Sequence, residues 1–494
     1  MKPVVLALCV IASPASAEPM FEDRSNGLPP HVYDGGWEHF VGGGLAVFDC
    51  NEDHLPDIYA AGGENAAALF QNDGDFSFTQ LDAPPLSGVT GAYPIDMDAD
   101  GVIDLFVLRV GANQILRGTG NCTFEPATEA MGIAPDDGWS TAFTAWWEKG
   151  DARPTLAIGN YVDRKEPDGP FEACDTNVIL RPQGAGYKSE MLRPGFCPLS
   201  ILAARDARGR ATLRLSNDRH YYVSGGHEQM WDIAERRFLG AEDGWDHVSL
   251  WGMGIASRDL NGDALDEVML TSMGDQLMQF ATTSGGYAAA RYEIGTYAQR
   301  PFVGDDGRPS TGWHAEFGDV DNDGRADLFI AKGNVDQMPG MAMADPNNLL
   351  MQRPDGTFVE VADKAGVATM ERSRGAALAD FDLDGRLDII VSNRRAPLEI
   401  YRNVTPEVGN WITVELQQAG GNTNAVGAVL TVTTPEGAQT LQQTIGGGHA
   451  GGQMLPRHFG LGDAVQAMVS IVWPDGTQTS QVVHAGTRAR IAKP

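Results

Sequence analysis

The chain has 494 residues, 42% of them hydrophobic, and its 66 Asp and Glu against 36 Lys and Arg give a formal net charge of −30. The hydrophobic content excludes a disordered chain and predicts a globular protein long enough for more than one domain. The excess of acid argues against nucleic acid or an anionic membrane as a partner.

Residues 1–17 have the pattern of a secretory signal. Lys2 is the basic start, Val4–Ile11 is a short apolar core, and Ala15-Ser16-Ala17 is a small-residue cleavage site. A lipid anchor at Cys9 is the less favoured alternative, because this cysteine lies inside the apolar core. No later apolar run approaches the ~18 residues of a transmembrane helix. The sequence therefore predicts an exported protein, periplasmic or extracellular, with no transmembrane segment.

One loop recurs throughout residues 36–404. Its fullest copy runs from Asp319 to Leu328, with oxygen-bearing side chains at positions 1, 3, 5 and 9, glycine at position 6 and an apolar residue at position 10. Ca²⁺ takes about 6–8 oxygen ligands, and alternate residues of a tight loop can supply them. The loop leads into a strand-like run, so it is not a helix-loop-helix calcium hand.

Five copies, here called the Asp loops, keep the oxygen ligands and are predicted to bind about five calcium ions. His54 and Ala264 take the glycine position in two of them. Two further copies instead carry Lys149 and Arg208, whose positive charge offers a built-in replacement for the ion. The alternative to calcium is a network of Asx turns without a cation. The predicted ligands are Asp49, Asn51, Asp53 and Asp57; Asp96, Asp98, Asp100 and Asp104; Asp259, Asn261, Asp263 and Glu267; Asp319, Asp321, Asp323 and Asp327; and Asp380, Asp382, Asp384 and Asp388.

The loop spacing predicts the architecture. Position 10 falls at seven places separated by about 50 residues, which is the period of a β-propeller with about four strands per blade. Residues 18–404 are therefore predicted to form an all-β, seven-bladed propeller, with residues 18–34 supplying a closing strand to the last blade. The Asp loops stop before residues 405–494, which have strands such as Trp411–Leu416 and are predicted to form a small C-terminal β-domain.

Four cysteines follow the predicted signal. An even number in an exported chain suggests disulfides. Pairing of Cys174 with Cys197 is favoured, because it closes a short loop within residues 161–200, a proline-rich stretch predicted to be an irregular excursion. Cys50 with Cys122 then follows by exclusion. The alternative is four free, buried thiols.

Aromatic and histidine residues lie just upstream of the first strand of several repeats. Because the Asp loop follows that strand, these residues are predicted to gather on the opposite face, near the mouth of the central channel, as a candidate ligand site. The alternative is that they are packing anchors. A further alternative is an enzyme in which His39, His247 and His314, with His227, hold a transition metal. The candidate residues are Trp37, His39, Trp139, Trp245, His247, Trp313 and His314.

Several short motifs resemble a known family. They are Gly42-Gly43-Gly44, Arg374-Gly375, Asn410-Trp411, Gly427-Ala428, His458-Phe459-Gly460-Leu461-Gly462 and Trp473-Pro474-Asp475-Gly476. The repeats resemble the FG-GAP or VCBS type of integrin α-chain heads, and the whole arrangement resembles the ASPIC/UnbV proteins, relatives of cartilage acidic protein. The resemblance implies a seven-bladed propeller, calcium in the Asp loops and a C-terminal ASPIC/UnbV domain, but no firm activity.

No serine-hydrolase elbow, phosphate loop or zinc-protease motif occurs in the chain. An enzyme is therefore the less favoured interpretation. The favoured function is a calcium-binding interaction module for a protein or glycan.

Overall fold

The structure, a computed structural model, describes residues 18–166, 173–218, 226–297 and 307–494. The predicted signal sequence, residues 1–17, lies outside this range. Within it the chain is built almost wholly of β-strands, and its one α-helix, α1 (Ala362–Ala365), is a single turn. None of the described helices is long and apolar enough to cross a membrane.

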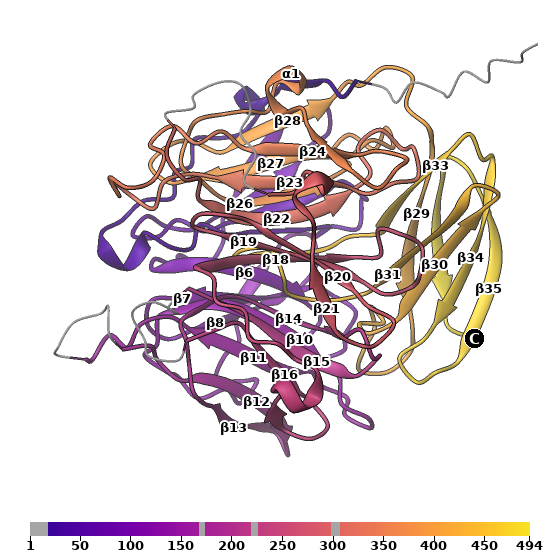
Figure 1. The fold of residues 1–494 in the computed structure, drawn as a ribbon. Helices are drawn as coiled ribbons and strands as arrows, with labels where there is room; N and C mark the ends of the chain where they lie inside the picture. Colours follow the sequence, from indigo (N-terminus) through magenta and orange to yellow (C-terminus); the bar gives the residue numbers. More distant parts are fainter. Residues whose placement is uncertain (1–17, 167–172, 219–225, 298–306) are drawn as a thin grey trace, which may run out of the picture.

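Successive segments of the chain form four-stranded antiparallel sheets, and within each sheet the strands pair in sequence order (Figure 1). The first six sheets contain, in chain order, β2 (Leu45–Phe48), β3 (Asp57–Ala60), β4 (Ala68–Asn72) and β5 (Phe78–Leu81); β6 (Val89–Ile95), β7 (Asp104–Arg109), β8 (Gln114–Gly118) and β9 (Phe124–Pro126); β10 (Ser140–Trp146), β11 (Thr155–Asn160), β12 (Asn177–Gln183) and β13 (Gly186–Leu192); β14 (Pro198–Arg205), β15 (Ala211–Asn217), β16 (Gln229–Asp232) and β17 (Arg237–Phe238); β18 (Gly252–Arg258), β19 (Glu267–Ser272), β20 (Leu277–Ala281) and β21 (Tyr287–Ala289); and β22 (Gly312–Gly318), β23 (Asp327–Lys332), β24 (Asn348–Gln352) and β25 (Phe358–Glu360).

A further sheet, the last of the repeat region in chain order, joins the two ends of that region. It contains β26 (Ser373–Ala379), β27 (Asp388–Asn393), β28 (Glu399–Asn403) and β1 (Phe21–Asp23). In it Phe21 of β1 lies opposite Asn403 of β28, which confirms that residues 18–34 supply a closing strand. The first strand of each sheet contacts that of the next, and β26 contacts β2, so the sheets close into a β-propeller.

One stretch is more regular than its composition suggests. Residues 177–192, inside the predicted irregular excursion, form β12 and β13. The proline at position 182 is tolerated because β11 pairs only with residues 178–180 of β12, so Pro182 lies beyond that ladder. The third sheet therefore contains part of a segment whose prolines suggested a loop.

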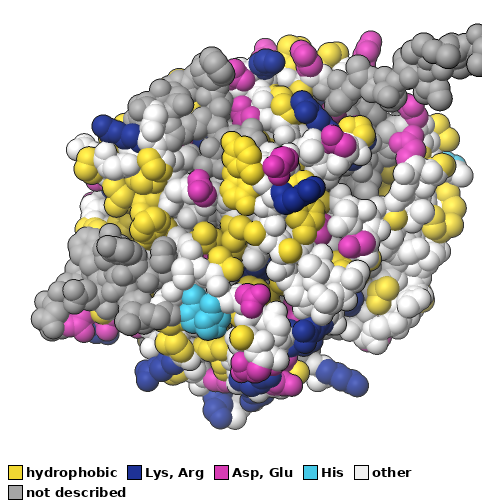
Figure 2. Space-filling view, viewed as in Figure 1, with side chains coloured by type: hydrophobic (Ala, Val, Ile, Leu, Met, Phe, Trp, Pro, Cys, Tyr) yellow, Lys and Arg dark blue, Asp and Glu magenta, His cyan; other side chains and the backbone are white. Residues whose placement is uncertain are grey.

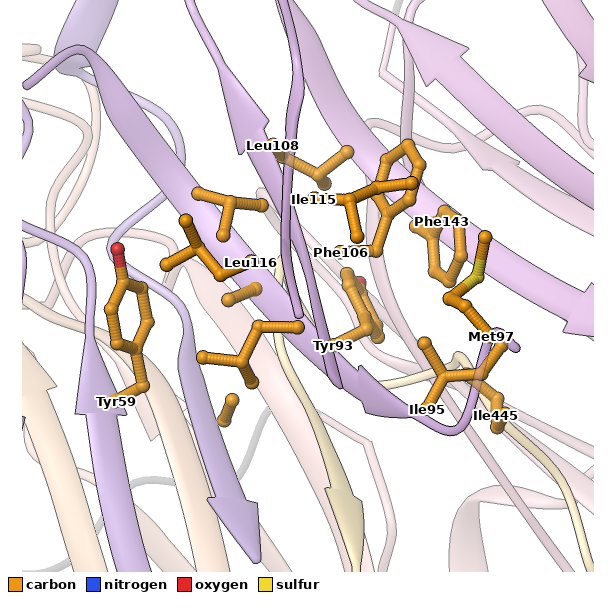
Figure 3. Packing of buried hydrophobic residues seen from close by; sticks show 14 of the residues in the cluster. Tyr59, Tyr93, Ile95, Met97, Phe106, Leu108, Ile115, Leu116, Phe143 and Ile445 are labelled. Carbon is orange, nitrogen blue, oxygen red and sulfur yellow. The ribbon is translucent and has the colours of Figure 1, made fainter. Parts of the chain in front are cut away.

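Neighbouring sheets pack through large apolar side chains. Phe106 of β7 stacks on Phe143 of β10 with ring centroids 4.3 Å apart, and Tyr93 of β6 lies 5.1 Å from the same ring (Figure 3). Because the inner strands are covered on both faces, all seven residues of β6 and of β26 are buried. Such continuously apolar or small-residue strands are expected where a sheet faces neighbours on both sides.

Residues beyond 404 form two further sheets, which lie against one face of the ring (Figure 1). One contains β29 (Asn410–Gln417), β33 (Arg457–Gly462) and β36 (Thr487–Ala492), and the other β30 (Val429–Thr434), β31 (Gly437–Gln442), β34 (Gln466–Val472) and β35 (Gln478–His484). Their apolar faces share a core that includes Ile412, Leu430, Phe459 and the fully buried Trp473.

Residues 443–456, here called the channel loop, leave these two sheets and enter the ring. The loop forms bridges to inner strands of five different sheets: Ile445 to β10, Gly446 to β14, Gly448 to β18, Gly451 to β6, and β32 (Gly452–Met454) in parallel with β2. Figure 3 shows Ile445 among the side chains of the first core cluster. The centre of the ring is therefore occupied by the chain itself.

The channel loop needs glycine because it passes close to the inner strands. Gly448 has φ +55°, and a Cβ there would lie 2.4 Å from Cε1 of His314. Gly446 has φ +108°, and its Cβ would lie 2.6 Å from the carbonyl oxygen of Ile201. Both the left-handed backbone and the close approach exclude larger residues.

Candidate functional site

Three of the Asp loops bring their carboxylates together. The groups Asp96, Asp98 and Asp104; Asp319, Asp321 and Asp327; and Asp380, Asp382 and Asp388 each place one oxygen per residue within 4.8 Å of the others. These are positions 1, 3 and 9 of the loop. Converging carboxylate oxygens of this kind are the donors that Ca²⁺ prefers. These oxygens therefore fit the predicted ion, and the loop already holds their side chains in place.

The loops are positioned by hydrogen bonds from the backbone to the carboxylates. In the group that begins at Asp319, this residue accepts the N–H groups of Asp323 (3.0 Å) and Gly324 (2.8 Å). Asp327, at the start of β23, accepts those of Val320 (3.0 Å) and, from β24, Gln352 (2.9 Å). The position-9 carboxylate thus ties the loop to two strands, which explains why it is buried.

The other position-9 residues make the same bond to the position-2 N–H. Asp104 accepts from Met97 at 2.8 Å, Asp388 from Phe381 at 2.8 Å, and Glu267 from Leu260 at 2.9 Å. These Asx-type bonds are the contacts expected of the cation-free alternative. Each carboxylate can accept more bonds than these. The hydrogen bonds are therefore compatible with an ion bound by the same carboxylates.

The tight turn forces position 6 into the left-handed region. Gly101, Gly324 and Gly385 have φ between +86° and +90°, and His54 and Ala264 take the same place at +73° and +66°. Glycine adopts this region without steric cost, whereas L-residues do so at a cost of about 1–2 kcal/mol. All five loops therefore keep one backbone shape, and two of them keep it under strain.

Burial and mutual repulsion perturb the carboxylates. Burial, with neighbouring carboxylates adding to it, raises the pKa of Asp104 and of Asp57 to about 7. The pKa of Asp319 and of Asp327 is also raised, first by burial and then by the other acids of their loop. Negative charges crowded in a low-dielectric site favour a compensating cation or a proton.

The loops that begin at Asp49 and Asp259 are organised less tightly. In the first, the amide of Asn51 donates to Asp53 at 2.8 Å, and Asp57 lies with Cys50 and Cys122, which are bonded to each other. In the second, the amide of Asn261 donates to Glu267 at 3.2 Å. The asparagines here turn their N–H groups toward the acids, so these two loops are weaker candidates for a cation.

The structure supplies a built-in cation in the fourth repeat from a different residue than expected. Arg210, rather than Arg208, pairs with Asp206, through an Nη2–Oδ2 distance of 2.6 Å. Arg208 instead turns to the neighbouring sheet, where its Nε donates to the carbonyl of Gly285 at 3.0 Å. Lys149 of the third repeat is exposed. Of the two repeats that carry Lys149 and Arg208, the fourth therefore has a guanidinium against its loop carboxylate.

The C-terminal sheets cover the Asp loops. Thr423 donates to Asp96 at 2.6 Å, the backbone N–H of Gly409 donates to the carbonyl of Asp321 at 2.9 Å, and Arg488 lies 3.3 Å from Asp380. The C-terminal sheets therefore lie on the face of the ring that carries the Asp loops.

Part of the predicted aromatic group does gather on the opposite face. Trp37 packs on Phe40 (centroids 4.8 Å apart) and on Trp139 (5.8 Å), and Trp139 and Trp313 belong to one buried cluster. His39 is buried nearby, with its ring 6.4 Å from that of Tyr33. Trp37 is 43% exposed, whereas Trp139 is 1% and Trp313 0% exposed. The two buried tryptophans are packing anchors, and Trp37 is the one that reaches solvent.

The remaining candidates lie elsewhere. Trp245 is buried in a separate cluster with Met230 and Leu239. His247 is exposed and stacks on His227. His314 points into the channel, where its Nδ1 accepts the backbone N–H of His449 at 3.1 Å. No group of three metal-ligating side chains among the described residues contains a histidine, so these rings do not converge as the enzymatic alternative requires.

Sequence reasoning missed His449, which is fully buried beside Trp313 with centroids 5.0 Å apart. Its Nε2 accepts the N–H of Gly42 at 3.2 Å, and burial lowers the pKa of the ring to about 3. The signal for it was the Gly446-Gly447-Gly448 run before it, since consecutive glycines mark a close backbone approach.

Both disulfides have the pairing favoured from the sequence, Cys50 with Cys122 and Cys174 with Cys197. The first links the Asp49 loop to the turn between β8 and β9. Two disulfides are consistent with an oxidising compartment outside the cytosol.

The charged side chains on the visible surface are of mixed sign (Figure 2). Several guanidiniums pair with the outer carboxylates of the Asp loops. Arg117 contacts Asp98 at 2.7 Å and Asp100 at 2.6 Å, and Arg402 contacts Asp382 at 2.8 Å. These ion pairs fix the orientation of the acidic side chains at positions 3 and 5 of the loops.

Comparison with known proteins identifies two segments. The ASPIC and UnbV family model matches residues 418–494, and the FG-GAP-like repeat model matches residues 49–107. Cartilage acidic protein 1 of Homo sapiens is 47% identical over 57 residues, which are 11% of this chain and 9% of that protein. The Xenopus tropicalis protein of the same name is 34% identical over 85 residues, 17% of this chain and 12% of that one. The similarity thus spans about a tenth of these relatives.

Solved structures with similar folds include the Dos1 propeller, at a TM-score of 0.39 and 10% identity, covering 77% of this chain and 96% of that one. YCF48 bound to D1 peptide has a TM-score of 0.43 and 10% identity, covering 79% and 99%. The two family models support the resemblance recognised from the sequence: a segment that matches an FG-GAP-like repeat precedes one that matches the ASPIC and UnbV model.

Proposed function

We propose that this chain is an exported, calcium-stabilised, seven-bladed propeller, residues 18–404, with a C-terminal domain, residues 405–494, and that it serves as an interaction module for a protein or glycan. The observation that carries the calcium part is the convergence of three carboxylates in each of three Asp loops, one of which lies in the segment that matches the FG-GAP-like repeat. The ions hold the loops rigid and neutralise part of the net charge of −30.

Calcium is proposed in all five Asp loops, bound most tightly where glycine is present and three acids converge. The ligands come from interstrand loops that also carry the docked C-terminal sheets. Binding the ion should therefore stabilise both the propeller and its contact with the C-terminal domain. This is a structural role, since the described loops bring no nucleophile to the carboxylates.

The test is a calcium titration of the mature protein after removal of bound ions. About five Ca²⁺ per chain are expected. Asp321→Asn should lower the number by one. The matched control is Asp355→Asn, because Asp355 lies in an ordinary Asp-Gly turn, where it accepts only from Thr357. Fewer than three ions, or equal stoichiometry in both variants, would contradict the proposal.

The interaction role is supported by the propeller fold and by Trp37. This side chain is 43% exposed on the face opposite the C-terminal domain and rests on the buried Trp139 and Phe40. A large aromatic side chain on a rigid base is the usual core of a protein or carbohydrate contact.

A glycan array and a panel of purified secreted proteins, probed with labelled protein, distinguish the two ligand classes. Trp37→Ala should abolish the signal without lowering the melting temperature. Tyr292→Ala is the control, since Tyr292 is 79% exposed and packs on Tyr297 outside the Trp37 cluster. Binding that survives Trp37→Ala would remove this face from the proposal.

A further inference from the structure

A cavity of about 470 Å³ lies between the ring and the C-terminal sheets. One wall consists of inner strands β14, β18, β22 and β26, and the other of β29, β31, β33, β36 and the channel loop. Its size is within the range of sites for small organic ligands, about 300–1,000 Å³, and junctions between domains are a preferred position for such sites. The cavity is separate from the Trp37 face.

Two arginines in the walls lack carboxylate partners. Arg457 donates to the side-chain oxygen of Gln443 (2.7 Å) and the carbonyl of Thr444 (3.1 Å), and Arg258 donates to the side-chain oxygen of Gln439 (3.4 Å). All three acceptors are neutral. Among the described residues neither arginine forms an ion pair, and the guanidinium of Arg258 lies over the ring of Phe459, 5.1 Å from its centroid. Buried guanidiniums normally require a carboxylate partner.

Two of the acids that line the same cavity, Glu316 and Asp266, accept hydrogen bonds from neutral donors, whereas Asp380 and Glu415 pair with Arg488 and Arg490. Glu316 accepts from the amide of Gln453 at 2.5 Å and from the backbone N–H of Leu378 at 3.2 Å. Asp266 accepts from the hydroxyl of Ser257 at 3.1 Å. The positive charge of the two arginines is thus not neutralised by direct pairing. Burial and the proximity of Arg258 lower the pKa of Arg457 to about 10, against the opposing effect of Glu316.

Polar atoms in these walls are left without partners. Arg258 and Thr413 are 6% and 7% exposed, and neither Nε of the first nor Oγ1 of the second has a hydrogen-bond partner. His458 contacts the carbonyl of Gly385 through Nε2, and its Nδ1 is also unpartnered. Buried polar atoms usually find partners, so three unpartnered atoms in residues that line one cavity show that the hydrogen bonding of its walls is incomplete.

The rest of the lining is apolar, with Leu202, Ile255, Leu378 and Leu441 facing the same space. At the outer rim, Arg490 pairs with Glu415 at 2.9 Å, and the side chain of Arg490 is 61% exposed. A ligand would therefore meet a charged rim, an apolar wall and a buried cationic base. We propose that the cavity binds a small organic anion, whose oxyanion head lies at Arg457 and Arg258 and whose apolar body lies along the leucine-lined wall.

The test uses isothermal titration of the full, calcium-saturated mature protein with octanoate, and separately with octylammonium and inorganic sulfate. Octanoate should bind one per chain. Octylammonium should bind at least about tenfold more weakly, because the cationic base repels it, and sulfate should also be weaker, because it lacks an apolar body. Equal binding of octylammonium, or no saturable binding of octanoate, would overturn the proposal.

Variants assign the binding to this cavity. Arg457→Gln should weaken octanoate at least about tenfold, whereas Arg457→Lys, which keeps the charge, should retain most of the affinity. Arg353→Gln is the matched control, since Arg353 is an exposed arginine in a turn outside the cavity. Undiminished affinity in Arg457→Gln would place octanoate elsewhere.

A second variant guards against a folding defect in Arg457→Gln. Leu441→Phe leaves both arginines in place and narrows the apolar part of the cavity, so it should weaken octanoate while leaving the melting temperature near that of wild type. Unchanged octanoate binding in Leu441→Phe would refute the apolar wall.

Discussion

Replacing Gly448 by alanine tests whether the channel loop fills the ring as described. The backbone there is left-handed (φ +55°), and a Cβ would lie 2.4 Å from Cε1 and 2.8 Å from Nδ1 of His314. Nδ1 of His314 also accepts the N–H of His449 at 3.1 Å. The substitution should therefore strain the backbone, push the imidazole away and weaken this hydrogen bond.

The cost follows from these contacts. Left-handed backbone costs an L-residue about 1–2 kcal/mol, overpacking of a tight site about 1–3 kcal/mol, and loss of a hydrogen bond about 1 kcal/mol. Gly448→Ala should thus lower the free energy of unfolding by about 3–6 kcal/mol. The control is Gly476→Ala, where φ is +88° and a new Cβ has nothing within 4 Å. Only the backbone cost of about 1–2 kcal/mol applies there.

Urea unfolding followed by tryptophan fluorescence gives the free energies, and limited proteolysis shows whether residues 443–456 become accessible. We expect Gly448→Ala to be at least about 2 kcal/mol less stable than Gly476→Ala and to be cut in the channel loop. If the two variants lose the same stability and the loop stays protected, the fit of this loop against His314 is not as described.

Further predictions concern the free energy of unfolding, measured in urea. Ala264→Gly should raise it by about 0.5–1 kcal/mol, because Ala264 has φ +66°. Gly101→Ala, where φ is +86° and a Cβ has open space, should lower it by about 1–2 kcal/mol, and the opposite order would refute the strain argument. Burial raises the pKa of Glu228 to about 8, so the unfolded chain releases this proton at lower pH than the folded one and stability should fall as pH rises from about 4.5 to 8. In melts recorded across this pH range, Glu228→Gln should remove about 3 kcal/mol of the stability lost by pH 7. An unchanged dependence of stability on pH would show that Glu228 is not responsible. Removing the Cys50–Cys122 disulfide, which closes 72 residues, should cost about 4 kcal/mol by calorimetry, and a loss below about 1 kcal/mol would show that the link is dispensable.

The parts of this molecule that depend on local sequence were predictable. The Asp loops are fixed by residues within ten positions of each other, so the spacing from Asp319 to Leu328 was enough to locate the turn and the strand after it. The closing strand β1 was also predictable, because a ring needs its ends joined. The prolines of residues 161–200 misled, because Pro182 lies outside the ladder that would have excluded it.

What could not be predicted depends on contacts between distant residues. The channel loop bridges Ala145 to Ile445, a separation that no local pattern records, and its glycines read only as a loop. Trp245 and Trp313 were predicted to gather on one face, yet Trp245 lies in the segment before β18 and Trp313 lies within β22, and the two belong to different clusters. The choice of Arg210 over Arg208 likewise depends on Gly285 of the next sheet, which captures Arg208.

The joining of β1 to β28 and the insertion of the channel loop set an order of assembly. The strand made first, Phe21–Asp23, finds its partner only when residues 399–403 have been made, and the residues that fill the centre come later still. Until residues 399–403 have been made, β1 has no strand to pair with. Until the channel loop has been made, nothing fills the space between the inner strands. A chain that crosses a membrane from its N-terminus would therefore complete its fold only after nearly all of it has arrived, which favours slow folding dominated by non-local contacts. Truncation before residue 456 should consequently disturb the whole ring and not only the end of the chain.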